Sequence, residues 1–259
     1  MSNKNICVVF LCNKEYLNRF IKTLYYLRHN GNYSGNVCLI IGDDLYKSKL
    51  LHELNDFIVY YNITIKYFPD IKFSDNFYTI NNKINSDGRN ITKKFQWHKL
   101  HLFNTFFKQW NYIFYIDCGI TIFSDISPII NEVSKNILLA HSDAFPEYKS
   151  KLYNQFDSNN KVIFQKLNQS YNLNIDYFQT TILLYDTNII QNNTFENLVK
   201  LAETYPISLT NEHGIIALYF TNIYPVFKQI KIKNNFTYFY DFLSRNPSNK
   251  YIMLKSYSI

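Results

Sequence analysis

The order of apolar runs in the first part of the chain restricts the fold most. Ile6–Leu11 and Val37–Ile41 are short, apolar on both faces and typical of buried parallel strands, and Ile63–Phe68 alternates as a third strand. Between them, Tyr16–Arg28 has apolar residues at helical spacing, and Lys47–Phe57 indicates a second helix. This β-α-β-α-β order predicts an α/β domain with a central, mostly parallel sheet flanked by helices.

The remaining chain predicts further elements but no domain boundary. Ser74–Asn90 is polar and indicates a loop, and a second polar stretch ends near Tyr171. The last forty or so residues look rich in loops. Strands are expected at Tyr112–Ile116, Ile120–Phe123, Ile137–Ala140 and Tyr177–Tyr185, and helices at Thr92–Gln109, Thr194–Thr204 and Glu212–Phe220. Because no linker or repeat interrupts the pattern, we predict one domain over residues 1–259.

Composition and charge restrict the class of protein. Apolar residues make up 47% of the 259 residues, which is enough for a hydrophobic core. The net charge of +7 suits an anionic ligand, but lysine and arginine are scattered, so no nucleic-acid-binding tail is indicated. The four cysteines form no Cys-x-x-Cys pair and predict buried, reduced thiols. The first apolar run is too short for a secretory core or membrane span, so we expect a soluble, cytoplasmic protein.

Polar residues follow several of the predicted strands. In open parallel sheets, ligands bind beyond the carboxyl ends of the strands. Polar groups stand there in Leu11–Lys14, Ile41–Asp44, Ile116–Gly119 and His141–Asp143. For Asp43 and Asp44 a role as helix cap or turn residue is an open alternative. No helix pattern follows Asp117, so this carboxylate is expected to be half-buried and to need a partner.

The segment around Asp117 resembles the DxD region of GT-A glycosyltransferases, with a layout closest to the glycogenin and lipopolysaccharide galactosyltransferase type. Other segments resemble that family in the same order, over about residues 6–220: the first strand and nucleotide loop in Val8–Tyr16, the helix before the DxD strand in Lys93–Phe103, the acceptor-side strand in Asp176–Thr187 and the DQ-bearing helix in Asn211–Phe220. Similar proteins occur in large DNA viruses with A/T-rich genomes, which suits the abundance of Asn, Ile, Lys, Tyr and Phe.

The resemblance implies transfer of a hexose or N-acetylhexosamine from a nucleotide-diphosphate sugar, with UDP expected, to a glycan or other hydroxyl acceptor. It places the nucleotide-binding half at about residues 1–125 and the acceptor-binding half at about 126–259. The residues expected to contact the donor are Cys12, Asn13, Lys14, Asp43, Lys99, Asp117, Cys118, Gly119 and Gln179. Gln179 is alternatively a buried, satisfied amide.

Two departures from the family affect the expected metal. Gly119 stands where the family has the second acid of DxD, which binds Mn²⁺ under the diphosphate, and the family's C-terminal His-x-x-Gly-x-x-Lys-Pro-Trp element is absent. Asp117 is therefore the single predicted ligand of a Mn²⁺ or Mg²⁺ ion whose presence is in doubt, and it could instead hold a ribose hydroxyl. The alternative is a cationic side chain, for which Lys14, Arg89, Lys99 and His101 are candidates. For each of these four, an ordinary surface or helix-face role is the competing interpretation.

An inverting transferase also needs a base for the acceptor hydroxyl, whereas a retaining one does not. Asp143 is the first candidate, with a turn or sugar-hydroxyl role as its alternative. Glu212 and His213 come next, and for both the alternative is a place in the first turn of a helix.

Two other classes of protein remain to be weighed. One is a nucleotide-sugar or glycan binding protein that has lost catalysis together with the second acid. The other is a nucleic-acid-binding protein, suggested by the net charge and the 18% aromatic content. Core positions account for most of the aromatic residues, so no nucleic-acid partner is predicted.

Overall fold

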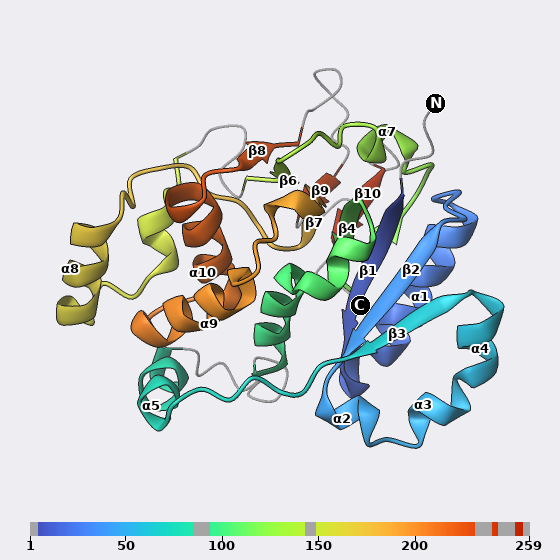
Figure 1. Cartoon of the computed structure of the whole chain (residues 1–259), viewed down its shortest axis with the longest axis horizontal. Helices are drawn as coiled ribbons and strands as arrows, with labels where there is room; N and C mark the ends of the chain where they lie inside the picture. The colour runs from blue at the N-terminus through green and yellow to red at the C-terminus, as the bar shows by residue number, and fades with distance from the viewer. Residues whose placement is uncertain (1–4, 85–93, 143–148, 231–239, 243–251, 256–259) are drawn as a thin grey trace.

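A seven-stranded sheet organises the chain, of which the computed structural model describes residues 5–84, 94–142, 149–230, 240–242 and 252–255 (Figure 1). The strand order is β3-β2-β1-β4-β7-β6-β8, and β7 alone runs antiparallel to its neighbours. This confirms the predicted α/β fold with a mostly parallel sheet. The strands are β1 Ile6–Cys12, β2 Asn36–Ile41, β3 Ile63–Tyr67, β4 Tyr112–Ile116, β6 Leu138–Ala140, β7 Ile182–Asp186 and β8 Phe227–Gln229.

Both faces of the sheet are covered, which explains the continuous apolar runs. Every residue of β1 is buried, and alternate residues enter different cores. Phe10 packs beside Phe20 of helix α1 (Leu17–His29), with ring centroids 5.4 Å apart. The opposite core includes side chains from α9 (Thr194–Thr204) and α10 (Glu212–Leu218), and the π-helix η6 (Tyr219–Ile223) continues α10. All four cysteines are buried and free, as predicted.

The expected helix at Thr92–Gln109 has a different form in the described part. Residues 94–96 are α-helical, and two 3₁₀ helices follow, η2 (Trp97–Phe103) and η3 (Thr105–Gln109). Asn104 separates them in an extended conformation, and its side chain accepts a hydrogen bond from the Phe106 amide (3.0 Å). All seven residues of η2 are buried, so this segment lies inside the protein, not on its surface with one apolar face.

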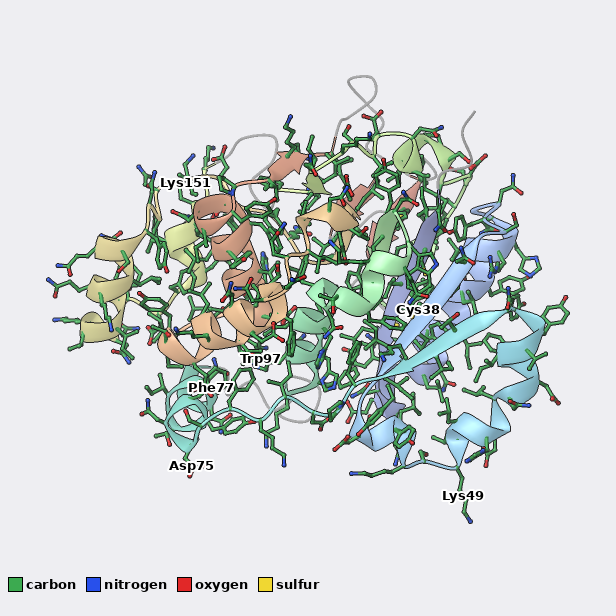
Figure 2. All side chains as sticks on the ribbon, viewed as in Figure 1. Cys38, Lys49, Asp75, Phe77, Trp97 and Lys151 are labelled. Carbon is green, nitrogen blue, oxygen red and sulfur yellow. The ribbon has the colours of Figure 1, made fainter. Side chains whose placement is uncertain are left out.

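Other elements also differ from the sequence-based expectation. Part of the predicted Ser74–Asn90 loop is helix α5 (Asp75–Ile84), whose Phe77 packs on Trp97 with centroids 5.2 Å apart (Figure 2). The polar stretch before Tyr171 contains the 3₁₀ helix η4 (Leu152–Gln155) and α8 (Lys161–Ser170). The expected Lys47–Phe57 helix is replaced by α2 (Asp43–Tyr46), α3 (Leu50–Glu53) and α4 (Asn55–Tyr60). Neither α3 nor α4 has a fully buried residue, so packing does not impose one continuous axis.

The second half has short strands and turns. Only the later part of the expected Tyr177–Tyr185 strand is β7, and the preceding residues run beside the end of β4, where the Asp117 amide donates to the Thr181 carbonyl (2.9 Å). A smaller sheet joins β5 (Ile120–Ile122), β10 (Met253–Lys255) and β9 (Tyr240–Phe242). The remaining elements are η1 Lys14–Tyr16, α7 Ser127–Ile130 and η5 Thr187–Ile189. Within the described ranges, no helix is long and apolar enough to cross a membrane.

Candidate functional site

A hollow of about 450 Å³, part of it open to solvent, lies at the carboxyl ends of β1 and β4. The strand order places these two parallel strands side by side, so their polar end residues meet at one edge of the sheet, as expected. The residues that line the hollow are Leu11, Asn13, Tyr16, Phe95, Gln96, Lys99, Tyr115, Asp117 and Cys118.

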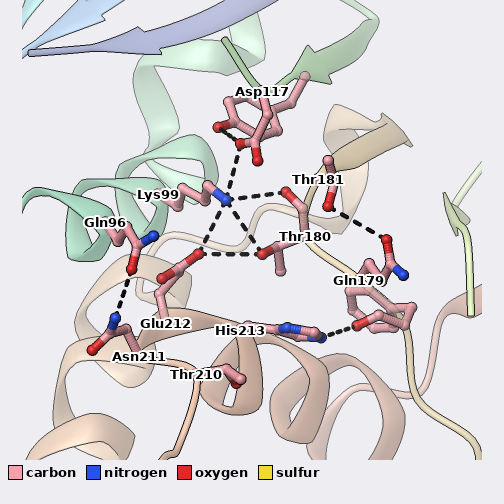
Figure 3. A network of polar contacts seen from close by, with 12 residues as sticks. Gln96, Lys99, Asp117, Gln179, Thr180, Thr181, Thr210, Asn211, Glu212 and His213 are labelled. Carbon is pink, nitrogen blue, oxygen red and sulfur yellow. Dashed lines mark hydrogen bonds and ion pairs between the residues drawn. The ribbon is translucent and has the colours of Figure 1, made fainter. Parts of the chain in front are cut away.

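Lys99 is the centre of a buried charge cluster at this hollow (Figure 3). Its Nζ lies 3.0 Å from Asp117 Oδ1 and 3.1 Å from Glu212 Oε1. The three residues come from different elements: Lys99 from η2, Asp117 from the end of β4, and Glu212 from the first turn of α10. Lys99 is 7% exposed and Glu212 is 2% exposed, so water screens this cluster much less than a surface pair.

The pKa values of the cluster follow from burial and pairing. Burial by itself lowers the pKa of Lys99, but the carboxylates of Asp117 and Glu212 outweigh it and raise that pKa above its usual range. Burial raises the pKa of Glu212, and the Lys99 ammonium opposes this rise without cancelling it. Burial, followed by the charge of Asp117, raises the pKa of Tyr115, whose hydroxyl donates to Asp117 Oδ1. Lys99 therefore stays charged and holds the two acids together.

Three buried polar atoms, one in the cluster, one in the lining of the hollow and one in α2 just beyond the end of β2, have no hydrogen-bond partner in the described part of the chain. They are Glu212 Oε2, Asn13 Nδ2 and Asp44 Oδ1. Glu212 Oε1 is satisfied, because it accepts from Thr180 Oγ1 (3.2 Å) as well as from Lys99. Buried polar groups are rarely left unpaired, so these atoms offer two acceptors and one donor to a ligand.

Neighbouring contacts fix α10 against the hollow. Asn211, just before α10, has a positive φ of 53°, a conformation that asparagine tolerates better than most residues. Its Nδ2 donates to Gln96 Oε1 (2.6 Å), which ties the helix start to the lining. His213 Nε2 lies 2.6 Å from the Phe178 carbonyl oxygen. The first turn of α10 is thus held on two sides.

The structure brings together many of the residues predicted from the sequence to bind the donor. Asn13, Lys99, Asp117 and Cys118 line the hollow, and Glu212 joins them through Lys99. Gly119 follows directly in the chain. Cys12 lies behind this lining: it is fully buried, and its thiol contacts the Asn13 carbonyl (3.1 Å). Lys14 is exposed beside it, and its amide donates to Asp44 Oδ2 (3.0 Å).

Other predicted residues lie apart from the lining. Asp43 accepts from the Tyr67 hydroxyl (2.6 Å) and pairs with Lys47 (3.3 Å) at the start of α2, which matches its alternative role as a turn residue. Gln179 is buried, and its Oε1 accepts from Thr181 Oγ1 (3.4 Å). Asp143 and Arg89 fall outside the described residues.

Several residues of the site were not singled out from the sequence. Tyr16 was assigned to a helix face, whereas it lines the hollow. Gln96 and Phe95 precede Lys99 in F-Q-W-H-K and also line the hollow. The segment was predicted as one amphipathic helix, and that prediction did not indicate that these two residues belong to the site. Thr180, next to the predicted Gln179, contacts both Lys99 and Glu212. Thr180 and Thr181 follow Gln179 as adjacent polar residues in an otherwise apolar stretch, and this pattern could have identified Thr180 as a site residue.

The residues around Asp117 cannot bind a divalent ion in the way that the resembled family does. Asp117 Oδ1 is already shared by the Lys99 ammonium and the Tyr115 hydroxyl, and Gly119 supplies no second carboxylate. Among the residues that the structure describes, no group of three or more His, Cys, Asp or Glu side chains is arranged to hold a metal ion. An ammonium bound to the candidate ligand opposes a second cation at the same oxygen.

His101, one of the cationic candidates, lies in the core instead. Its ring stacks between Phe68 (centroids 4.3 Å apart) and Phe195 (4.4 Å), and burial lowers its pKa to about 3. A neutral, sandwiched imidazole supplies no positive charge to a ligand.

We expect this burial to make the protein sensitive to acid. The unfolded chain binds a proton at His101 near pH 6.5 and the folded chain does not, so stability is lost as pH falls from 6.5 towards 3. Each pH unit in this interval costs up to about 1.4 kcal/mol, so the full loss is on the order of 5 kcal/mol. Urea unfolding at several pH values should show that the free energy of unfolding falls less at low pH in His101→Phe than in wild type. The same substitution at the exposed His52 serves as control. An equal decrease in the free energy of unfolding at low pH in wild type and His101→Phe would contradict the prediction.

Comparisons with known proteins support the fold. No protein-family model matches the sequence, and no curated protein matches it significantly. Solved structures do match. Galactosyltransferase LgtC, in complex with donor and acceptor sugar analogues, aligns with a TM-score of 0.56 and 11% identity, over 86% of this chain and 72% of LgtC. Glycosyltransferase GlyE of Streptococcus pneumoniae TIGR4 gives 0.55 and 14%, over 91% of this chain. Core-mannan synthase A of Aspergillus fumigatus, in a Mn/GDP form, gives 0.51 and 11%, over 88% of this chain and 73% of that one.

These likenesses establish a GT-A glycosyltransferase fold. The chain spans only 47% of GlyE, and only 39% of the bifunctional glycosyltransferase WbbM, which it matches with a TM-score of 0.52 and 13% identity over 88% of its own length.

Proposed function

We propose that this protein is a glycosyltransferase that moves a sugar from a nucleotide-diphosphate sugar, with uracil as the preferred base, to a hydroxyl acceptor. The observation that carries the proposal is the buried Lys99 between Asp117 and Glu212, at the ligand-binding edge of a GT-A fold. Buried charges are costly, and clusters of them in a hollow are frequent at active sites.

The nucleotide is assigned to the side of the hollow formed by the end of β1. Tyr16 offers an aromatic face for stacking a base. Asn13 Nδ2 and Asp44 Oδ1 are an unpaired donor and an unpaired acceptor. Uracil presents both a carbonyl acceptor and an N–H donor, which is the chemistry that these two atoms lack.

The sugar is assigned to the charge cluster. Glu212 Oε2 is a buried acceptor without a partner in the described chain, and a sugar hydroxyl would supply its missing hydrogen bond. Lys99 keeps Asp117 and Glu212 close together and limits repulsion between them. Of the base candidates, we place Glu212 at the sugar, because it belongs to this cluster. His213 remains a candidate for the acceptor side, and Asp143 remains a sequence-based prediction.

The proposal is tested by measuring release of nucleoside diphosphate from UDP-sugars and GDP-sugars, with monosaccharide and oligosaccharide acceptors and mass spectrometry of the products. We expect one UDP-sugar to be turned over, and Asp117→Asn to reduce the rate about 100-fold or more, because Asp117 holds Lys99 in place. Asp157→Asn is the matched control, since Asp157 lies outside the lining of the hollow. No turnover with any donor would refute transfer.

Thermal unfolding separates transfer from binding alone. A ligand that binds only the native state raises the unfolding midpoint. A UDP-sugar that raises the midpoint of wild type but is never turned over would identify a binding protein that lacks catalysis, which is the second candidate because Gly119 replaces an acid.

A further inference from the structure

Gly119 has a backbone conformation that disfavours an acid, or any other residue with a side chain, at this position. Its φ is +93°, in a region where a side chain is strained whatever space surrounds it. Space itself is available, because an added Cβ would meet only the Arg19 side chain, at 3.5 Å from its Cδ. The chain is therefore built around a glycine here, and a carboxylate at this position would cost conformational energy.

Arg19, on α1, occupies the neighbourhood of this missing side chain. Its guanidinium carbon lies 4.9 Å from the centroid of the Tyr16 ring, and Tyr16 lines the hollow. Arg19 is exposed and forms no ion pair within the described ranges. The contact with Tyr16 holds the guanidinium beside a residue that lines the hollow and leaves its charge in place.

A negatively charged ligand in the hollow needs a positive charge in addition to that of Lys99. Lys99 is already bound by two carboxylates, so the cluster of Lys99, Asp117 and ionised Glu212 has excess negative charge. A nucleotide-diphosphate sugar carries negative charge on both phosphates and would be repelled by it. A guanidinium forms two parallel hydrogen bonds to phosphate oxygens, which makes it well suited to stabilise a departing diphosphate.

We propose that Arg19 binds the diphosphate of the donor, at the place where the resembled family positions a metal ion on its second acid. The inference rests on the proposed function and deepens it: the glycine at position 119 and the arginine at position 19 together replace the acid and its ion. Binding of the diphosphate then needs no divalent ion.

The test compares UDP with uridine, because their difference isolates the diphosphate. Dissociation constants are measured by calorimetry in EDTA, for wild type and Arg19→Ala. We expect wild type to bind UDP more tightly than uridine, and Arg19→Ala to bind UDP about 10–100-fold more weakly while its affinity for uridine is unchanged. GDP and guanosine are measured in parallel in case the base is guanine.

Lys166→Ala is the matched control for the loss of one exposed positive charge. Lys166 lies on α8, at the opposite end of the molecule from α1 (Figure 1), and its substitution should leave UDP affinity unchanged. Equal weakening in this control would show a general charge effect and overturn the assignment. Lys14→Ala is measured as well, and if it alone abolishes the preference for UDP, Arg19 is not the diphosphate ligand.

Failure of this inference can be told from failure of the proposed function. If wild type binds neither nucleoside diphosphate with or without Mn²⁺, the proposed function loses its donor. If UDP binds only when Mn²⁺ is added, and Arg19→Ala binds it equally well, the function stands and the role of Arg19 is refuted. Binding in EDTA that depends on Arg19 supports both.

Discussion

Replacing Lys99 with methionine is expected to lower the free energy of unfolding by about 3–5 kcal/mol at pH 7, because it leaves the half-buried Asp117 and the buried Glu212 as neighbouring carboxylates without the ammonium that lies between them. The loss should shrink as pH is lowered. Burial raises the pKa of Glu212, so its folded-state carboxylate takes up a proton before the unfolded one does, and the cost present at high pH is relieved. Urea unfolding between pH 5 and 8 measures both effects.

Two further variants make this expectation specific. Lys108→Met removes a lysine whose Nζ donates to the Ile190 carbonyl (2.9 Å) and forms no ion pair with any described residue, so its cost should stay near 1 kcal/mol. The double variant Lys99→Met with Glu212→Gln should recover part of the lost stability, since one buried charge is gone. If Lys99→Met were as stable as Lys108→Met at pH 7, the cluster would not be the buried ion network described above.

Replacing Glu212 with glutamine is expected to reduce sugar transfer by roughly 100-fold or more, because the amide has the shape of the carboxylate but lacks its charge. UDP affinity should change little, since the sugar and not the nucleotide is assigned to Glu212. Steady-state kinetics with the UDP-sugar and calorimetry with UDP measure the two effects.

The chain offers a closely matched control for Glu212→Gln. Glu196 stands in the first turn of α9 as Glu212 does in α10, but it is exposed. Glu196→Gln should therefore leave transfer unchanged. A rate loss in both variants would indicate a helix-dipole effect, and a Glu212→Gln enzyme with full activity would remove Glu212 from the mechanism.

The sequence by itself determined the frame of the protein. Continuous apolar runs such as those at β1 and β2 can be buried only in a covered parallel sheet, so the α/β class and the positions of the first strands followed from the sequence. The lone Asp117 at the end of an apolar strand required a partner for the same reason: a half-buried carboxylate is unstable alone. The polar edge of the sheet was therefore predictable without coordinates.

Only the tertiary structure decided how that edge is made. Lys99 was predicted on an amphipathic helix, and packing on all sides of η2 carried it inside, next to Asp117 and Glu212, which is 113 positions further along the chain than Lys99. Local periodicity reports only neighbours within a few residues, so it could not reveal this pairing, nor the stacking of His101, nor the approach of Arg19 to Gly119. Such contacts arise from long-range packing, in which the free energy of burying the whole core overrides local preference.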